Sequence, residues 1–302
     1  MNLDELRALI AVVDTGSMIA AAKVTRMPRV SLRRRLDELE ARAGVALLVR
    51  TPAGVTATPA GEAMARSGRI LLQQANALMA QSREIGREPT GVMQVMLPHG
   101  LPLEPLLVLL QQVAPHKGLQ ISLQYAADPL REPLADMDFV LHFGHDTPDG
   151  PWLSYQLIRL HTRLLASREY LEANGRPATL ADLNAHALFV WRSPEHEAGR
   201  LPCVDGETAV IVPRLISSDI FALRRFASLG MGIAYVPDPG VEFLGDPSAG
   251  LEQVLPEKVG QATALRLLVP AALIDLPKVR VALDLVQALV GGLGLPEPSI
   301  LR

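Results

Sequence analysis

The chain has 302 residues, of which 49% are hydrophobic and 20% are charged, so it is too apolar for a disordered protein and long enough for two or three folded units. Its single cysteine, Cys203, excludes an internal disulfide, and no spacing of cysteine and histidine resembles a zinc site. No signal peptide or bilayer-spanning apolar stretch stands out, so we expect a soluble, cytoplasmic protein without a membrane partner or a cofactor.

The net charge of −3 is unevenly distributed along the chain. Residues 1–88 contain 13 Lys and Arg against 9 Asp and Glu, a net charge of +4, whereas the remaining residues contain 16 against 23, a net charge of −7. This asymmetry suggests that the N-terminal part meets a polyanion and that the rest has another role.

Three short helices are predicted near the N-terminus. Apolar residues recur at helical spacing from Leu3 and stop at Gly16, Ser17 can cap a second helix of about residues 17–25, and Pro28 stands in the first turn of a third helix, of about residues 28–43. We interpret this arrangement as a helix-turn-helix.

The third helix carries its charges in an unusual order, with arginines in its first half and acids in its second half. A helix is stabilised by the opposite order, so local stability does not explain the pattern. Leu32, Leu36 and Leu39 share one face, and Val30 and Arg34 point away from it. The arginines either form a solvated face or bind an anion outside the chain.

A hairpin and a long helix follow. The sequence "VALLVRTPAGVTATPAG" contains two short β-type runs around a Pro and Gly turn, and Thr58 and Pro59 read as the N-cap and first residue of a helix that reaches about Glu88. This helix either pairs with a second copy of the chain or packs onto the C-terminal part of the same chain. Pairing is our preferred interpretation. The segment 86–91, "GREPTG", then ends the helix as a hinge.

From about residue 90, strand and helix patterns alternate, which favours an α/β domain with largely parallel sheets. The expected strands are 92–97, 119–125, 138–144, 163–167, 188–191, 209–217 and 232–237, and the expected helices are 103–113, 168–175 and 219–230. Ligands of such sheets bind at the carboxyl ends of the strands.

At this point the sequence resembles a known family. The segments "NLDELRALIAVVDTGSMIAAA", "RRRLDELEARAGVALLVRT", "GVTATPAG" and "FASLGMGIAYVP" are similar to LysR-type transcriptional regulators over essentially the whole chain. The resemblance implies a winged helix-turn-helix at 1–58, a linker and dimerisation helix at 59–89, and a two-lobed, periplasmic-binding-protein-like α/β effector domain at 90–302. Lobe I would comprise 90–160 and 266–302, and lobe II would comprise 161–265.

The resemblance also implies which residues meet DNA. The third helix would enter the major groove, where arginines bind guanines or phosphates and Val30 touches a thymine methyl group, while the wing lies over the backbone or minor groove. The expected DNA contacts are Ser17, Arg29, Val30, Ser31, Arg33, Arg34, Arg50 and Thr51. Arg33, Thr25 and Ala53 depart from the family pattern, which carries Ser, Leu and a basic residue there. Arg33 adds positive charge in the groove and Ala53 removes it from the wing, and we expect DNA binding to be retained.

By the same resemblance, a small-molecule effector binds between the two lobes. The expected contacts are His99, Gly100, His142, His145, Trp191, Ser217, Ser218, Val236 and Pro237. Relatives often place Ser or Thr near position 99 to receive a carboxylate, so His99 weakens that assignment, although a partly protonated histidine or the helix start after Ser218 could bind an anion. Trp191 is either a core residue or a platform for the ligand.

Two other interpretations are less favoured. His142, His145 and Asp146 supply only three candidate metal ligands, so we expect a buried strand-end histidine beside a surface loop and no metal site. An enzyme is not expected, because the sequence has no G-x-S-x-G, phosphate-loop or dinucleotide motif. We therefore expect a ligand-responsive transcriptional regulator whose partners are double-stranded operator DNA, an effector, a second copy in a dimer or dimer of dimers and the transcription machinery.

Overall fold

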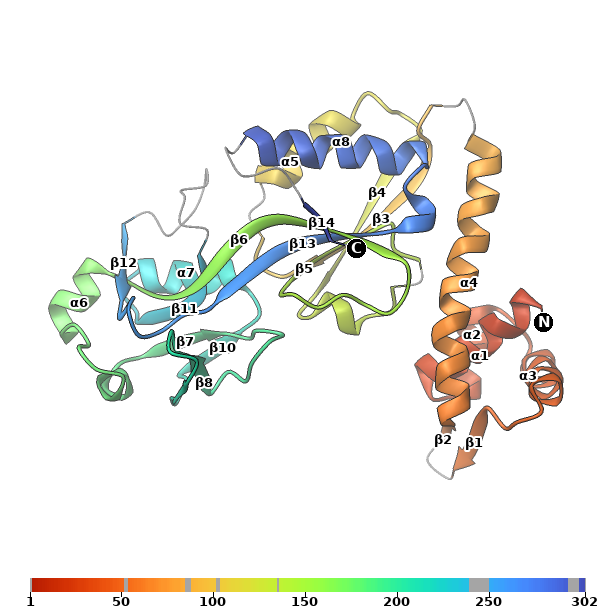
Figure 1. Ribbon diagram of the computed structural model, residues 1–302, viewed down its shortest axis with the longest axis horizontal. Coiled ribbons are helices and arrows are strands. Elements are labelled where there is room, and N and C mark those ends of the chain that lie inside the picture. Colours follow the sequence, from red (N-terminus) through yellow and green to blue (C-terminus); the bar gives the residue numbers. More distant parts are fainter. Residues whose placement is uncertain are drawn as a thin grey trace.

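The computed structural model describes residues 2–51, 54–84, 88–101, 104–134, 136–238, 250–292 and 299–301. Along the chain these residues form a small N-terminal domain, one long helix and a two-lobed sheet domain (Figure 1). The predicted class, an α/β chain with a helical N-terminal domain, is therefore confirmed.

The N-terminal domain consists of three helices and a hairpin. Its elements are α1 (Leu3–Thr15), α2 (Met18–Thr25), α3 (Arg29–Ala43), β1 (Leu48–Thr51) and β2 (Gly54–Ala57). As predicted, Gly16 ends α1 and the Ser17 hydroxyl caps α2, by accepting a hydrogen bond from Ala20 N. The structure shows that Gly16 adopts the left-handed conformation. Pro28 does not lie in the first turn of α3: its extended backbone, with φ −57° and ψ 140°, makes it the residue before the helix.

Helix α3 is held on α1 by one apolar face and two ion pairs. Leu32, Leu36 and Leu39 are buried in the same cluster as Leu6 and Leu9 of α1. Arg35 pairs with Asp4 at 3.0 Å, and Arg42 pairs with the buried Glu5, whose carboxyl pKa it holds below the usual value. Arg29, Arg33 and Arg34, in the first half of α3, take no part in these contacts with α1.

The long helix α4 (Pro59–Glu84) starts against the hairpin. Thr58 Oγ1 accepts a hydrogen bond from Gly61 N at 3.0 Å, as predicted for an N-cap. Only glycine fits at position 61, because a Cβ there would lie 1.9 Å from Leu47 O. Farther along, Ile70 packs against Gly150 of the sheet domain, so α4 contacts the C-terminal part of the same chain. Glu88 lies outside the helix, which is shorter than predicted, and part of the predicted hinge lies outside the described residues.

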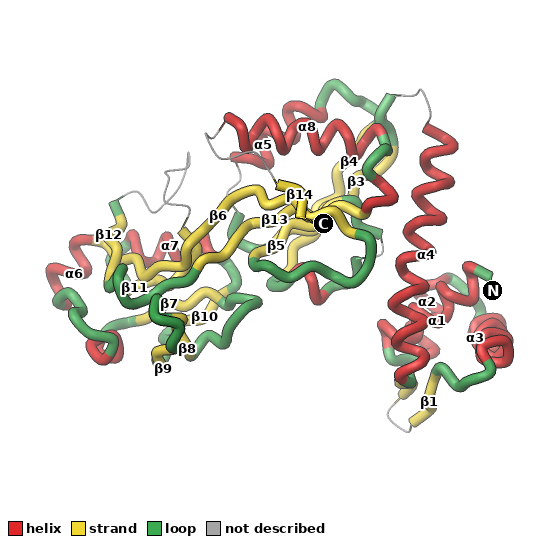
Figure 2. Tube along the Cα trace, viewed as in Figure 1, coloured by secondary structure: helices red, strands yellow, loops and turns green. Residues whose placement is uncertain are grey.

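The sheet domain is built on one sheet that continues through both lobes (Figure 2). Its strands are β3 (Gly91–Pro98), β4 (Leu119–Ala126), β5 (Phe139–Phe143), β6 (Trp152–Ser167), β7 (Leu188–Trp191), β10 (Leu215–Ser217), β11 (Ile233–Asp238), β12 (Leu251–Val254), β13 (Ala262–Pro270) and β14 (Ser299–Leu301). The strand order is β10-β7-β11-β6-β13-β5-β3-β4, and β12 and β14 also pair with β6. Strands β3, β4 and β5 are mutually parallel, as are β7, β10 and β11, whereas β6 and β13 are antiparallel to their neighbours.

Helices complete the two lobes. Lobe I, around β3, β4 and β5, adds α5 (Glu104–Val113), η1 (Pro129–Arg131), η3 (Ala271–Leu273) and α8 (Pro277–Gly292). Lobe II, around β7, β10 and β11, adds α6 (Arg168–Asn174), η2 (Ala181–Ala185) and α7 (Ile220–Ser228), with the separate hairpin of β8 (Arg200–Pro202) and β9 (Thr208–Val210). Helices α5 and α8 cover one face of the lobe I sheet (Figure 1).

Two long strands, β6 and β13, run side by side from one lobe to the other (Figure 1). Only the end of β6, at 163–167, was predicted from the sequence, and β13 was not predicted as a strand. The expectation of a single strand over 209–217 is wrong: Pro213 lies between β9 and β10, and these strands join different sheets. Proline lacks the N–H that a continuous ladder needs.

A buried ion pair fastens α8 to the start of lobe I. Lys278 Nζ lies 2.7 Å from Asp138 Oδ2 and donates to Val92 O at 2.8 Å. The Asp138 carboxylate also accepts a hydrogen bond from Gln94 N at 2.8 Å. The Asp138 carboxylate, directly before β5, therefore connects α8 and β3.

Replacing Asp138 with alanine is expected to lower the free energy of unfolding by about 3 kcal/mol, because it leaves a largely buried ammonium group without its counter-charge. Urea titration of the full chain measures this loss. Glu132→Ala, at an exposed position that follows η1, is the matched control and should change the free energy by less than about 0.5 kcal/mol. Equal effects of the two changes would contradict the assignment.

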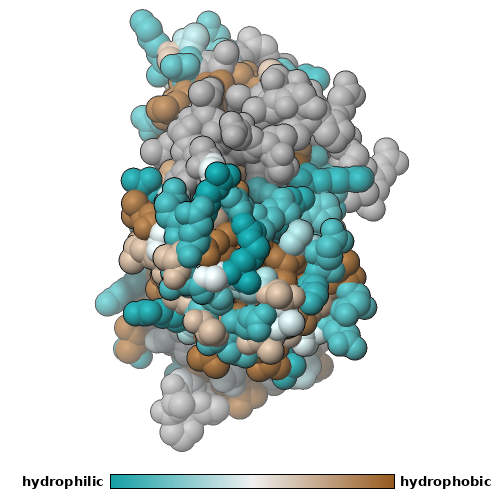
Figure 3. All heavy atoms as spheres, turned by 90° about the vertical axis from the view of Figure 1, so that its left-hand side faces the viewer, coloured by the Kyte–Doolittle hydropathy of each residue, from teal (hydrophilic) through white to brown (hydrophobic). Residues whose placement is uncertain are grey.

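The outer end of lobe II is largely hydrophilic, with separate hydrophobic patches (Figure 3). In this lobe Glu252 pairs with Arg168 at 2.8 Å and with Arg176, which ties β12 to α6 and the segment after it. Among the residues that the structure describes, none of the helices is long and apolar enough to cross a membrane.

Candidate DNA-binding surface and effector seam

The exposed face of α3 is the first candidate site. Val30 is 81% exposed, and the Arg33 and Arg34 side chains are 62% and 70% exposed. Each of these arginines lies near an acid one turn later, with Arg33 Nε 3.8 Å from Asp37 and Arg34 Nη1 3.5 Å from Glu38. Exposed pairs of this kind are worth only a few tenths of a kcal/mol, so they leave both guanidinium groups available to a stronger anion.

The other predicted DNA contacts surround this face. Arg29 is exposed at the first turn of α3, Ser31 is half-buried, and Ser17 is half-buried at the N-cap of α2. Arg50 and Thr51 lie on β1, where they pair with Val55 and Gly54 across the hairpin. The side chains of Arg50 and Thr51, and all of Ala53, lie outside the described residues.

The second candidate site is the seam where the two lobes meet. The carboxyl ends of β3 and β5 place His99 and His145 at the same edge of lobe I, and both contact lobe II. His99 Nδ1 lies 2.9 Å from Ser218 Oγ, and the His99 ring stacks on Tyr125 at a centroid distance of 6.4 Å. Strand ends of parallel sheets thus bring together residues that are far apart in the sequence.

Gly100 brings the lobe I backbone directly onto the start of α7. A Cβ at this position, where φ is +79°, would lie 2.3 Å from Ile220 N and 3.0 Å from the Asp219 side chain. The helix N-terminus that could bind an anion is therefore covered by the His99 and Gly100 turn in this arrangement. Its own N-cap is Asp219, which accepts a hydrogen bond from Ala222 N, and Ser217 accepts one from Asp219 N.

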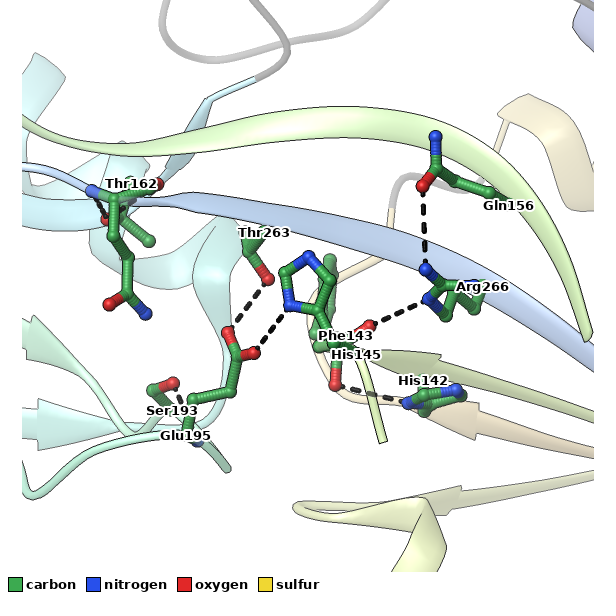
Figure 4. Close-up of polar contacts among 11 residues, drawn as sticks. His142, Phe143, His145, Gln156, Thr162, Ser193, Glu195, Thr263 and Arg266 are labelled. Atoms are coloured by element: carbon green, nitrogen blue, oxygen red, sulfur yellow. Dashed lines mark hydrogen bonds and ion pairs between the residues drawn. The ribbon is translucent and has the colours of Figure 1, made fainter. Parts of the chain in front are cut away.

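A second contact across the seam joins His145 to Glu195. His145 Nδ1 lies 2.9 Å from Glu195 Oε1, and Glu195 Oε2 accepts a hydrogen bond from Thr263 at 3.0 Å (Figure 4). Glu195 follows β7, and Thr263 lies on β13. Neither residue was predicted, although an acid shortly after a strand that ends in Trp191 is a usable signal for a group at the carboxyl edge of the sheet.

Near this contact, the buried Arg266 forms hydrogen bonds with several polar groups. Arg266 donates to Gly144 O at 3.1 Å and to Ser154 at 3.3 Å, and its Nη2 lies 3.5 Å from Gln156 Oε1 (Figure 4). Burial lowers the pKa of this guanidinium, although Glu195 opposes the shift. The register pairs Arg266 with His142, and Arg266 lies next to a bulge in β6, where Leu157 stands between the partners of Leu265 and Arg266. Arg266 was not among the predicted site residues.

His142 is a buried strand-end histidine, as expected. Its Nδ1 lies 3.2 Å from Phe143 O (Figure 4), and its buried Nε2 has no hydrogen-bond partner among the residues that the structure describes. In the described part of the chain no cluster of His, Cys, Asp and Glu could hold a metal ion.

Burial lowers the pKa of His142, and the nearby Arg266 contributes in the same direction. A histidine with a lowered folded-state pKa stabilises the fold fully above the unfolded pKa of about 6.5 and loses that contribution as pH falls toward the folded value. Stability is therefore expected to fall between pH 7 and pH 5, and His142→Gln should flatten this slope. Thermal unfolding across that range measures it; an unchanged slope would contradict the burial of the neutral ring.

The remaining predicted effector contacts are buried in this arrangement. Trp191 is 2% exposed and packs edge-on against Phe143 at a centroid distance of 5.3 Å. Val236 and Pro237 lie on the buried part of β11. The structure thus places Trp191 in the core, and its contact with an effector, like those of Val236 and Pro237, stays a prediction.

Comparisons with known proteins agree with this architecture. Residues 3–62 match the family described as bacterial regulatory helix-turn-helix protein, lysR family, and residues 86–290 match the LysR substrate binding domain. Among curated proteins, the chain is 27% identical to the HTH-type transcriptional regulator CrgA of Neisseria meningitidis, over 78% of this chain and 80% of that protein. It is 26% identical to the HTH-type transcriptional activator AaeR of Escherichia coli, over 78% of this chain and 77% of that protein.

Solved structures of two regulators align with nearly the whole chain. The Vibrio cholerae virulence activator AphB aligns with a TM-score of 0.56 and 25% identity, over 95% of this chain and 98% of that chain. ArgP from Mycobacterium tuberculosis aligns with a TM-score of 0.60 over 95% of this chain and 97% of that chain, at 19% identity, which shows the fold alone. The chain belongs to the LysR family: it is a transcriptional regulator with an N-terminal DNA-binding domain and a C-terminal effector-binding domain.

Proposed function

We propose that this regulator recognises its operator with α3. We further propose that its binding to DNA changes when a small molecule binds at the seam between the lobes. The observation that carries the first part is the division of α3 into a buried leucine face and an exposed face with Val30, Arg33 and Arg34. An exposed apolar residue flanked by guanidinium groups suits the major groove, where thymine methyl groups and guanine acceptors lie side by side.

The further DNA contacts belong to the same proposal. The first turn of α3 presents Arg29 and Ser31, the N-cap of α2 presents Ser17, and the wing contributes Arg50 and Thr51. Phosphate contacts from these residues would set the position of α3 on the duplex, and the base contacts would supply its sequence preference.

For the effector, we propose the seam residues that the sequence analysis named, which are His99, Gly100, His142, His145, Trp191, Ser217, Ser218, Val236 and Pro237. The contacts of His99 with Ser218 and of His145 with Glu195 support this location, because a ligand that exchanged them for its own contacts would change how the lobes meet. The seam carries both histidines and a carboxylate, so a ligand with its own hydrogen-bond donors and acceptors fits it better than a purely apolar one.

We propose domain boundaries at 58 and 89, and lobe boundaries at 160 and 265. The hairpin ends at Ala57, and β6 and β13 pass through both lobe boundaries. As a regulator of chromosomal genes the protein would act in the cytoplasm, with the transcription machinery as a further partner, and the effector would be bound and not turned over.

Mapping of binding sites across the genome with the full-length protein tests this proposal. We expect a small set of sites, and binding to them that weakens steeply as salt rises. Compounds processed by the products of neighbouring genes then form a short panel for thermal-shift assays. Sites without a common sequence, or conversion of a panel compound by the protein, would count against the proposal.

We also propose that α4 pairs with a second copy of the chain, and that such dimers form a dimer of dimers. Leu71 and Met79 on α4 are 41% and 56% exposed, whereas Ala65 and Leu72 on the same helix are buried. Apolar side chains that repeat along an exposed helix favour association with another helix.

Leu71→Glu is expected to shift the protein toward monomer, since a carboxylate would be buried in the helix pair. Sedimentation velocity at several concentrations measures this shift. Asn76→Glu adds the same charge to the same helix on the side that faces Arg7, and it should leave the mass unchanged. A wild-type monomer, or an unchanged mass of the Leu71 variant, would overturn the pairing through this face.

A further inference from the structure

The loop 144–151, which joins β5 to β6, contacts the seam at one end and the linker helix at the other. Its sequence, GHDTPDGP, contains two prolines, which fix φ and limit the freedom of the backbone. Both ends are also tied to β13 and its continuation, through Gly144 N to Ala264 O at 3.0 Å and Ala271 N to Pro151 O at 2.8 Å. The loop is thus a short, constrained connection.

At the seam end, the loop is held by lobe II. His145 pairs with Glu195 at 2.9 Å, and a Cβ on Gly144 would lie 3.3 Å from the Glu195 carboxyl carbon (Figure 4). The Glu195 side chain is only 20% exposed and is also bound by Thr263, so its position is well determined. Any movement of lobe II relative to lobe I changes the surroundings of Gly144 and His145.

At the other end, the loop is packed on α4. A Cβ on Gly150 would lie 3.1 Å from Ile70 Cγ1, so the Gly150 backbone lies directly on the Ile70 side chain. Asp149 adds an exposed ion pair with Arg66 at 3.7 Å, which contributes little energy on its own. Helix α4 also contacts η3, whose first residue is the one hydrogen-bonded to Pro151.

We propose that loop 144–151 couples the contact between the two lobes to α4. The contact of His145 with Glu195 joins the loop to lobe II, and the contact of Gly150 with Ile70 joins it to α4. This inference rests on the proposed function, in which an effector changes the seam. Coupling between two sites requires an element whose conformation depends on both of them. The eight residues of this loop contact both the seam and α4. The consequence is a route from the effector domain to the DNA-binding domain within one chain.

Hydrogen exchange of the full-length protein tests the route without effector or DNA. Glu195→Ala removes the seam contact, and we expect amide exchange to rise by about threefold or more both in loop 144–151 and in the facing part of α4, residues 66–72. Exchange in the core of α1, residues 6–12, should not change. Because coupling is reciprocal, Ile70→Ala should raise exchange at 144–147 as well.

Glu252→Ala is the matched control, since it removes a carboxylate with two arginine partners elsewhere in lobe II, and it should alter neither segment. If Glu195→Ala raises exchange throughout the chain, His145→Ala tests the same seam contact instead. This half-exposed side chain can be removed without loss of core packing. Faster exchange in the loop with unchanged exchange in α4 would overturn the inference. Failure to find an effector would affect only the proposed function, because this measurement uses none.

Discussion

Arg34→Ala is expected to weaken binding to the native operator by about 1–3 kcal/mol, which corresponds to roughly a 5-fold to 150-fold rise in Kd. The Arg34 side chain lies 70% exposed on the face of α3 opposite the leucines, where its ion pair with Glu38 is weak. Binding titrations at several salt concentrations separate its two possible roles. A base contact relaxes the preference for one base pair, whereas a phosphate contact lowers affinity for all sequences and reduces the salt slope by about one.

Arg131→Ala provides the matched control, because this arginine is also exposed but lies in lobe I. It should leave DNA affinity unchanged. Arg33→Ser tests the position at which the chain departs from the family pattern, and the loss it causes shows how much of the affinity depends on that departure. An Arg34 variant with wild-type affinity would refute the assignment of this face.

The N-terminal domain was the most predictable part of the chain, because its signals are local. Gly16 and Ser17 mark a helix end and a cap within two residues, and Leu32, Leu36 and Leu39 recur within one helix. The structure confirmed each of these features. Pro28 was misplaced by one position because proline is favoured both at the first turn of a helix and in the extended residue before it.

The sheet domain was predictable in its class but not in its crossovers. Strand β13 pairs with β5 and β6, more than 90 residues earlier in the chain, and no local pattern encodes such pairing. The seam shows the same limit. His99 was predicted as a site residue, and Ser218 was predicted separately, but their contact depends on how the lobes close. Arg266 was missed because it stands in no motif, and Glu195 was missed because its one signal is its place shortly after β7.

Gly100→Ala is expected to force the two lobes apart at the turn where lobe I meets α7. The added Cβ would lie 2.3 Å from Ile220 N, which is backbone and cannot rotate away. The alanine must also adopt a φ of +79°, which costs about 1–2 kcal/mol in the left-handed region. Together with the clash, we expect a loss of about 2–4 kcal/mol in the free energy of unfolding, and faster amide exchange in the first turn of α7.

Gly206→Ala isolates the two contributions. Gly206, in the turn between β8 and β9 of lobe II, has a φ of +86°, close to that of Gly100, but a Cβ there would meet nothing within 4 Å. Its alanine variant should show the backbone strain alone, about 1–2 kcal/mol, and no change of exchange in α7. The excess cost at position 100 then measures the contact between the lobes. Equal costs of both variants, with α7 unaffected, would mean that the lobes in solution do not meet at this turn. In that case an effector would have no closed seam at His99 and Ser218 to act on.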